Sequence, residues 1–352
     1  MDAKQTLINF IPLIDSKLNE FWDQEIAKNF GFNQKQKNLV KKMLLHAKEH
    51  NLRAAKRIRG AFVFYAYQLG KSTDDRIWDA AIGVELVHTA LLMHDDAMDQ
   101  DDVRRGRPTT HKFFENGDSH YGESMAYDLG DAVLSLGYEQ VLNSKFDSDL
   151  VIKATQKLLR GITGTAHGQA FDISLEKLSS WTEDDVITLH RAKTALYTYE
   201  NPLFIGAILA GLKGKVFDVL HDYSMDGGVA FQLQDDILGV FGDPEKTGKS
   251  ADSDLLQGKC TLLISHILKA GSASQIVALK KVWGKRSAPK SDIDLAKTAI
   301  IDSGSLDYSK KISKDYAAKA VKTAEELRNL KLNPEAIDFI QGVADYMVNR
   351  DL

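Results

Sequence analysis

The chain contains a single cysteine, Cys260, and only six prolines among 352 residues. One cysteine cannot form an intramolecular disulfide, which excludes a small secreted fold held by disulfides. The longest apolar run, from Pro202 to Leu212, falls short of the roughly 20 residues that a membrane-spanning helix requires. The opening residues, MDAKQTLINF, also lack the basic and apolar regions of a signal peptide. We therefore expect a cytoplasmic protein with no transmembrane span, and loose association with a membrane surface stays open.

The chain also lacks an excess of positive charge: 45 Lys and Arg residues stand against 49 Asp and Glu residues, for a net charge of −4. No general polycationic field exists to hold nucleic acid, so any anionic ligand must be met by a local basic cluster. Hydrophobic residues make up 43% and charged residues 27% of the chain, which is ordinary for a globular protein. The length fits one large domain or two small ones, and we expect residues 1–352 to fold throughout.

Apolar residues recur at three- and four-residue spacing through long segments, and this pattern predicts an all-α fold. Two segments, Ala80–Met93 and Tyr197–Leu212, are apolar on most of their circumference and should lie in the centre of a bundle. Turn-rich segments separate the helices at 104–110, 242–258 and 284–291. The predicted helices span residues 4–28, 34–49, 57–69, 74–99, 122–143, 149–174, 183–211, 214–240, 260–282, 291–303, 308–330 and 334–349.

Five acidic residues lie within positions 95–102, at the end of the apolar helix predicted for 74–99. Asp95 and Asp99 share one helix face at about 5–6 Å between Cβ atoms, close enough to ligate the same hard cation. Mg²⁺ would relieve the repulsion between them, and it prefers one or two carboxylates together with substrate phosphates. The spacing indicates a site for magnesium and a diphosphate, and the alternative is an exposed acidic helix end.

A second aspartate pair, Asp235-Asp236, ends the apolar helix predicted for 214–240. The repetition makes a chance acidic helix end a weak explanation for either motif. Two such ends that met at one mouth of a helical bundle would form a metal-binding rim above an apolar interior.

Basic side chains near the motifs are candidates for holding a diphosphate. Arginine can bind phosphate oxygens through two parallel hydrogen bonds, and a helix N-terminus adds backbone N–H donors. The alternatives are charge compensation of the neighbouring acids and solvated or snorkelling lysines. The candidates are Lys56, Arg57 and Arg59; Arg104, Arg105 and Arg107; Lys193, which Thr194 follows; and Lys249 and Lys259.

Three further polar residues lie on apolar helices, where they need partners. His88 precedes Asp95 by two helical turns on the same face and could donate to a phosphate. A lone histidine there could equally be a core residue with internal partners. Gln169 and Asp172 could reach a metal cluster through water or could join two helices by a hydrogen bond.

Taken together, these motifs resemble those of the trans-isoprenyl diphosphate synthases, the family of the farnesyl and geranylgeranyl diphosphate synthases. The resemblance covers about Lys56–Lys259 and implies an all-α antiparallel bundle around a deep central cavity, as a single domain and a homodimer. The matching motifs are Asp95-Asp96-Ala97-Met98-Asp99 with Arg104-Arg105-Gly106, then Asp235-Asp236-Ile237-Leu238, Phe241-Gly242-Asp243-Pro244, Thr247-Gly248-Lys249, Asp254 and Gly258-Lys259.

The resemblance implies a Mg²⁺-dependent prenyltransferase that joins an allylic diphosphate to isopentenyl diphosphate. The implied Mg²⁺ ligands are Asp95, Asp99 and Asp235, with Asp96, Asp236 and Asp254 in supporting positions. The residues implied to hold isopentenyl diphosphate are Lys56, Arg59, His88 and Arg105. Those implied to hold the allylic diphosphate are Arg104, Lys193, Thr194, Gln232, Lys249 and Lys259. The residues implied to carry catalysis are Asp95, Asp99, Arg104, Lys193, Asp235 and Lys249.

The chain departs from the family pattern at three places. Gly239 stands where some relatives carry a third aspartate, so one metal contact must come from elsewhere or from water. Ala54-Ala55 precedes Lys56 where the family often has glycines. The last residues, 349–352, lack the basic tail that closes the site in some relatives.

Product length should depend on the side chains four and five residues before Asp95, which are Leu91 and Ala90. Relatives that stop at C15 often have bulky aromatic residues there, so the resemblance implies a geranylgeranyl (C20) main product, with farnesyl (C15) or longer chains as alternatives. The rival functions are a terpene cyclase or head-to-head coupling enzyme of the same fold, and a non-catalytic partner subunit of a synthase. Both kinds of rival usually lose or replace an aspartate motif, and this chain keeps both.

Overall fold

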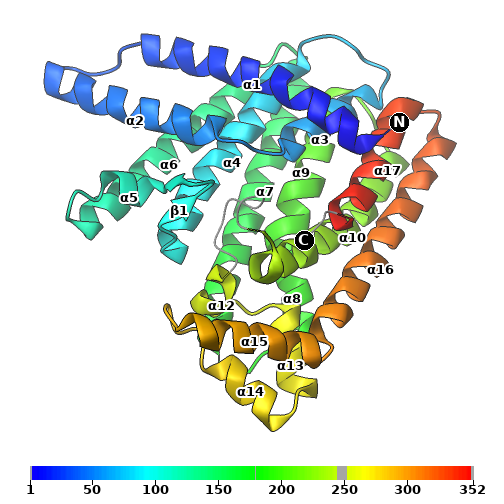
Figure 1. Cartoon of the computed structure of the whole chain (residues 1–352). Helices are drawn as coiled ribbons and strands as arrows, with labels where there is room; N and C mark the ends of the chain where they lie inside the picture. Colours follow the sequence, from blue (N-terminus) through cyan, green and yellow to red (C-terminus); the bar gives the residue numbers. More distant parts are fainter. Residues whose placement is uncertain (1, 179, 244–251, 350–352) are drawn as a thin grey trace. The chain divides into compact units, whose positions relative to one another are not determined.

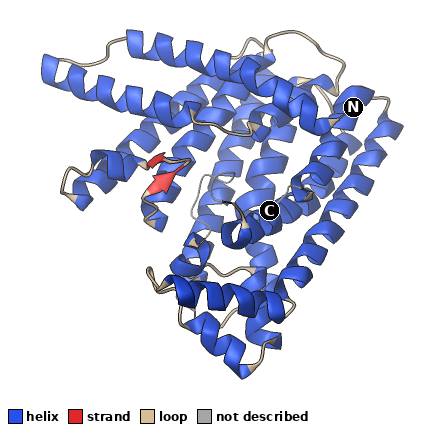
Figure 2. Cartoon of the chain, in the orientation of Figure 1, coloured by secondary structure: helices blue, strands red, loops and turns tan. Residues whose placement is uncertain are grey.

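The computed structural model describes residues 2–178, 180–243 and 252–349. Most of these residues lie in helices, and the strands in this part of the chain form one short hairpin (Figure 2). The prediction of an all-α fold is confirmed. None of the helices in the described ranges has both the length and the apolar character needed to cross a membrane.

The chain forms two compact units. The first unit comprises residues up to Leu158 and Pro202–Lys213, and the second comprises Leu159–Asn201 and residues from Gly214 onward. The first unit contains α1 (Ala3–Ala27), α2 (Gln34–Leu52), α3 (Ile58–Gln68), α4 (Ile77–Asp99), β1 (Val103–Arg104), β2 (Arg107–Pro108), α5 (Thr110–Phe114), α6 (Ser119–Leu142), the beginning of α7 (Ser148–Leu175) and most of α9 (Asn201–Leu209). The second unit contains the rest of α7, α8 (Glu183–Leu189), the π-helix η1 (His190–Glu200), α10 (Lys215–Phe241), α12 (Ser253–Gln257), α13 (Leu262–Ala270), α14 (Ala273–Lys280), α15 (Lys290–Asp302), α16 (Ser305–Glu325), the 3₁₀-helix η2 (Glu326–Leu330) and α17 (Pro334–Val348).

In the first unit, α4 packs along α6 so closely that the contact requires glycine. A Cβ atom on Gly137 of α6 would lie 2.7 Å from Val87 Cγ2 and 2.8 Å from the Gly83 carbonyl oxygen of α4. Most of α4 between Ala80 and Met93 is buried, as its apolar sequence predicts. This packing holds the acidic end of α4 on a rigid helix.

The helices α1 and α2 form an antiparallel pair at one edge of the first unit (Figure 1). A stripe of apolar residues at three- and four-residue spacing is buried along α1 and includes Phe10, Leu18 and Trp22. Trp22 Nε1 donates a hydrogen bond of 2.9 Å to Asn51 Oδ1 near the end of α2.

In the second unit, α10 packs along α16 and against η1. A Cβ atom on Gly168 of α7 would lie 2.8 Å from the Lys193 backbone nitrogen, and one on Gly228 of α10 would overlap Ala195. Glycines on both neighbours therefore leave room for the wider turns of η1. Lys193 and Thr194 consequently lie on a π-helix, an element that is rare and is often found at functional sites.

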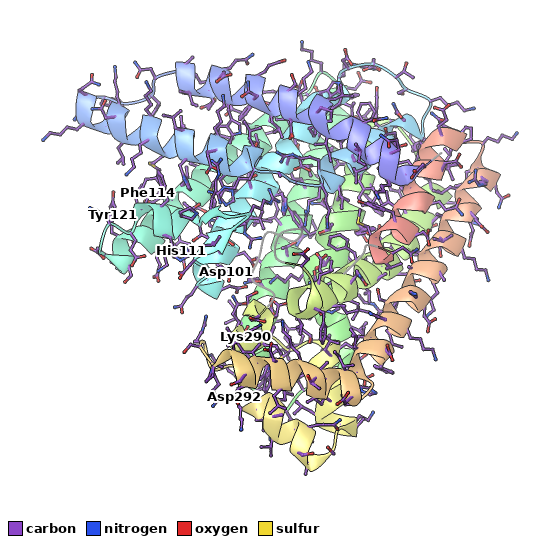
Figure 3. The ribbon with its side chains drawn as sticks, viewed as in Figure 1. Asp101, His111, Phe114, Tyr121, Lys290 and Asp292 are labelled. Atoms are coloured by element: carbon purple, nitrogen blue, oxygen red, sulfur yellow. The ribbon has the colours of Figure 1, made fainter. Side chains whose placement is uncertain are left out.

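Several predicted boundaries were wrong for local reasons. The segment 183–211 is not one α-helix, because η1 interrupts it. The segment 260–282 divides into α13 and α14, because Gly271 is extended and Ser272 caps α14 by accepting a hydrogen bond from the Gln275 N–H. The prediction also missed the β1–β2 hairpin and the five-residue helices α5 and α12. Figure 3 shows α5 with His111 and Phe114 and the start of α6 with Tyr121.

Candidate active site

Asp95 and Asp99 lie in the last turns of α4, whose C-cap residue, Gln100, has a left-handed backbone of φ 58°. Both aspartates are partly exposed and share a helix face through their i,i+4 spacing. Within the described ranges, no group of three or more acidic, histidine or cysteine side chains forms a metal site by itself. Two carboxylates completed by phosphate oxygens and water are nevertheless a donor set that Mg²⁺ accepts, so this pair fits the implied metal.

Asp96, between these two residues, has a different environment. Its side chain is 0% exposed, and its carboxylate forms an ion pair with Arg104, whose Nε donates a hydrogen bond of 2.5 Å to Asp96 Oδ1. His50 Nε2 lies 3.7 Å from Asp96 Oδ2. Burial alone would raise the pKa of Asp96, but the positive charge of Arg104 and a contact from His50 outweigh it and lower the pKa. Asp96 is therefore a buried anion that holds Arg104.

The β1–β2 hairpin positions the arginines that follow the first acidic motif. Arg105 and Gly106 form its two-residue turn with φ values of 54° and 72°, and Arg104 pairs with Arg107. Arg105 Nη1 donates to the Arg53 carbonyl at 3.2 Å, and Arg53 Nη1 donates to the Arg104 carbonyl at 3.1 Å. These reciprocal bonds join the hairpin to the loop before α3. Burial, with Arg104 and Arg57 nearby, lowers the pKa of Arg105 to about 10, so Arg105 stays charged at neutral pH.

The basic run before α3 divides into structural and accessible residues. Arg57 is buried and binds Asp15 at 2.7 Å and Glu85 at 3.1 Å, so its charge is already neutralised by the protein. Lys56 is exposed, and Arg59 Nη1 donates to His88 Nε2 at 3.0 Å. Burial and the charges of Arg59 and Arg105 hold the pKa of His88 well below its usual value. His88 is therefore neutral and accepts the bond from Arg59, which places Arg59 beside the face of α4 that carries Asp95.

The two predicted chain-length residues lie on different faces of α4. Leu91 is partly exposed and precedes Asp95 by one turn on the same face. Ala90 is 0% exposed and lies on the stripe of Val87 and His94, which contact α6. A larger side chain at Ala90 would therefore meet α6, whereas one at Leu91 would stay on the Asp95 face.

The second aspartate pair, Asp235-Asp236, divides into a partly exposed and a buried residue, as the adjacent Asp95 and Asp96 do. Asp235 is partly exposed near the end of α10, and Asp236 is buried. Asp236 Oδ2 lies 3.1 Å from His190 Nε2, and Asp236 Oδ1 accepts a hydrogen bond of 3.0 Å from Gln232 Nε2. Gln232 Oε1 in turn accepts a bond of 2.8 Å from Thr194 Oγ1. Two predicted ligands, Thr194 and Gln232, are thus joined to the motif by one network.

Two predicted lysines in the second unit share one carboxylate. Lys193 Nζ donates to Asp172 Oδ2 at 2.8 Å, and Lys259 Nζ lies 3.6 Å from the same oxygen and 3.2 Å from Glu176 Oε1. Asp172 therefore links helices, which is one of the two roles predicted for it. The arrangement keeps two ammonium groups close together in one place, where Asp172 and Glu176 balance their charge.

The structure explains why residue 239 is a glycine, which the sequence does not. A Cβ atom on this residue of α10 would overlap the carboxylate of Asp254 on α12. The missing side chain therefore lets Asp254 approach α10 at the position where some relatives carry a third aspartate. We expect Asp254 to take over part of that role.

The expected result of replacing Gly239 by alanine is a displaced Asp254. Helix propensity by itself predicts that Gly239→Ala stabilises α10 by about 1 kcal/mol. A loss of metal affinity in this variant would therefore come from the displaced Asp254 and not from a weaker helix. If Asp254 supports the metal, the Mg²⁺ concentration for half-maximal activity should rise about tenfold or more. Gly164→Ala is the matched control, because its Cβ would meet only Leu196 Cδ1 at an ordinary 3.6 Å. An unchanged Mg²⁺ requirement in folded Gly239→Ala would remove Asp254 from the site.

Two aspects of the site were not found from the sequence, the histidine contacts to the buried aspartates and the neutralisation of Arg57. His50 and His190 each contact the buried aspartate of a motif, but neither carries a sequence signal, since both come from distant segments. The neutralisation of Arg57 by Asp15 and Glu85 was also missed. Lys249 lies outside the described residues.

The sequence of this chain is similar to a family model and to several known proteins. A sequence model described as polyprenyl synthetase matches residues 41–300. A geranylgeranyl diphosphate synthase of Saccharolobus solfataricus is 32% identical over 334 residues, which cover 93% of this chain and 96% of that protein. A geranylfarnesyl diphosphate synthase of Aeropyrum pernix is 32% identical over 286 residues, covering 80% and 85%.

A solved structure gives a match over the full chain. The geranylgeranyl pyrophosphate synthase of Corynebacterium glutamicum, crystallised with isoprenyl diphosphate and magnesium, has a TM-score of 0.89 and 26% identity. The match covers 100% of both chains. Both aspartate pairs and both sets of basic residues described above lie within the residues that the sequence model matches.

Proposed function

The chain belongs to the polyprenyl synthetase family, and on that premise we propose that it is a Mg²⁺-dependent trans-prenyltransferase. It condenses an allylic diphosphate with isopentenyl diphosphate, head to tail, to a short-chain prenyl diphosphate, with geranylgeranyl (C20) as the main product. The observation that carries the proposal is that each motif has one partly exposed and one buried carboxylate at adjacent positions, Asp95-Asp96 in the first and Asp235-Asp236 in the second. Relatives named as geranylgeranyl and geranylfarnesyl synthases support the product class.

The accessible carboxylates would hold the metal. Asp95, Asp99 and Asp235 are the proposed Mg²⁺ ligands, and bound Mg²⁺ would supply electrophilic stabilisation of the leaving diphosphate. Asp96 and Asp236 support them from buried positions. The choice of metal is supported by the C. glutamicum relative, which was crystallised with magnesium.

We assign the basic residues to two diphosphates, as the family pattern implies. Lys56, Arg59, His88 and Arg105 would hold isopentenyl diphosphate. Arg104, Lys193, Thr194, Gln232, Lys249 and Lys259 would hold the allylic diphosphate. Because Arg104 is buried against Asp96, its contribution is a fixed positive charge near Asp95 rather than a mobile ligand.

The protein groups act mainly through charge and position. Lys193, Arg104 and Lys249 neutralise the negative charge that grows on the leaving diphosphate as the allylic carbon–oxygen bond breaks. Holding the isopentenyl double bond beside the resulting carbocation makes carbon–carbon bond formation effectively unimolecular. The proton that is then lost passes to the departing diphosphate.

We also propose a cytoplasmic homodimer in which each chain is one catalytic domain. Support for self-association comes from exposed apolar side chains on α6, including Tyr121, Tyr127 and Leu142. Size measurement of the purified chain tests this proposal.

A product assay tests the proposed reaction. The purified chain should convert isopentenyl diphosphate and C5, C10 or C15 allylic primers mainly to a C20 diphosphate, read by mass spectrometry. A cyclase would release a hydrocarbon or alcohol instead, and a non-catalytic partner subunit would give no product alone.

The same assay tests product length through Leu91. Leu91→Phe adds bulk on the face of α4 that carries Asp95, so the product should shorten to C15 or less. Ala90→Phe should shorten it as well, but it also packs against α6, where an overfilled core costs about 1–3 kcal/mol. Leu91→Phe is therefore the sharper variant, and Leu91→Met, which keeps the side-chain volume nearly unchanged, is its control. An unchanged product distribution in active Leu91→Phe would show that the tail does not pass this face.

A further inference from the structure

The turn between α1 and α2 exposes two aromatic side chains. This α1–α2 tip comprises residues 28–33, and in it Phe30 is 61% exposed and Phe32 is 91% exposed. Their ring centroids lie 6.1 Å apart in an edge-on contact, so the two rings form one apolar surface. The tip is the free end of the α1–α2 pair (Figure 1) and precedes the residues that match the family model. The proposed reaction gives these rings no role.

The tip is ordered rather than a loose loop. Asn33 caps α2 by accepting a hydrogen bond of 2.9 Å from the Gln36 N–H, and Gln36 Oε1 accepts one of 2.9 Å from the Phe32 N–H. These two bonds fix the backbone that carries Phe32. The backbone that carries the exposed Phe32 ring is therefore ordered before binding, which lowers the entropy cost of binding.

A run of lysines without any acidic residue extends from the tip into α2. Between Glu25 and Glu49 the sequence contains six lysines and no acidic residue, although the whole chain has a net charge of −4. Lys28 is compensated by Glu25 and Lys48 by Asp23. The remaining four lysines of this basic segment are Lys35, Lys37, Lys41 and Lys42.

We propose that the α1–α2 tip and the basic segment bind the surface of an anionic lipid bilayer. Aromatic rings next to lysines are the pairing that enters a membrane interface, where the rings reach the acyl boundary and the ammonium groups meet lipid phosphates. A protruding turn suits a deformable lipid surface better than a protein partner, which would need a matching cavity for two rings. The inference needs only these side chains and holds whether or not the proposed reaction is correct.

Cosedimentation of the full chain with vesicles tests the inference without any turnover step. The chain should pellet with vesicles of phosphatidylcholine and phosphatidylglycerol and much less with phosphatidylcholine alone. Phe30→Ser/Phe32→Ser should lower the partition coefficient about tenfold or more. Lys35→Gln/Lys41→Gln should lower it roughly fivefold per lysine at low salt, and added salt should erase that difference.

Matched controls separate the tip from general surface effects. Val277→Ser removes a 58% exposed apolar side chain from α14, and Lys311→Gln/Lys314→Gln removes two exposed lysines from α16. Both controls should bind vesicles like the unchanged chain, and the tip variants should keep normal turnover in vesicle-free buffer. Equal pelleting of Phe30→Ser/Phe32→Ser and the unchanged chain would overturn the proposal. Dissociation of a dimer in the Phe30→Ser/Phe32→Ser variant would also overturn it, because the tip would then contact a second copy of the chain.

Discussion

Asp95→Ala and Asp235→Ala are each expected to lower kcat by about two to three orders of magnitude or more while the chain stays folded. Both carboxylates are partly exposed at helix ends, so their removal opens no core cavity. The loss should appear in kcat, because these groups would stabilise charge that develops only as the allylic bond breaks. Steady-state kinetics with mass-spectrometric product detection measures the effect, and a chelator should abolish turnover.

Asp102→Ala is the matched control for the first motif. Asp102 belongs to the same acidic stretch, but its side chain is exposed and lies 3.3 Å from Lys112 Nζ. The Asp102→Ala variant should retain nearly normal kcat. Near-normal turnover in Asp95→Ala or Asp235→Ala, with an unchanged circular dichroism spectrum, would contradict the assignment of the metal ligands.

Asp96→Ala is expected to act on stability instead. Removing this carboxylate leaves Arg104 buried, at 8% exposure, without its principal partner. Breaking a buried ion pair in this way destabilises a protein by about 3–5 kcal/mol. Urea denaturation should show the loss for Asp96→Ala and a much smaller change for Asp95→Ala.

Two further measurements check this assignment. Asp96→Leu combined with Arg104→Met should recover much of the stability, because neither variant residue leaves an unpaired buried charge.

The pKa of Asp96 is lowered in the folded chain. Its contribution to the free energy of unfolding is therefore present above about pH 4, the ordinary carboxyl range, and is lost as the pH falls through the lower folded value. Asp96→Asn should flatten the stability profile in that acidic range. Equal stability of Asp95→Ala and Asp96→Ala would refute the division of roles.

Much of the molecule was predictable from local sequence. Regular three- and four-residue spacing predicted an all-α chain and most helix positions, because helix formation and amphipathic burial depend on neighbouring residues. The pair Asp95 and Asp99 and the pair at 235–236 were placed at helix ends for the same reason. The short hairpin was missed because it depends on Arg105 adopting a positive φ, a conformation that its residue type does not favour.

The tertiary structure alone decided which of these polar residues are accessible. Asp95 and Asp96 are adjacent and chemically identical, yet contacts from Arg104 and His50 make Asp96 a buried structural anion. In the same way, Asp15 and Glu85 neutralise Arg57 while Arg59 reaches His88.

The role of Gly239 was also decided by the tertiary structure and not by the sequence. In the sequence it is a missing ligand, but in the fold its empty side-chain position admits Asp254 from α12. The sequence by itself determined the helices and the motifs, since these follow from short-range spacing. Charge, exposure and role were decided by partners from distant segments, because the energy of an ionised group depends on burial and on the opposite charges that folding brings to it.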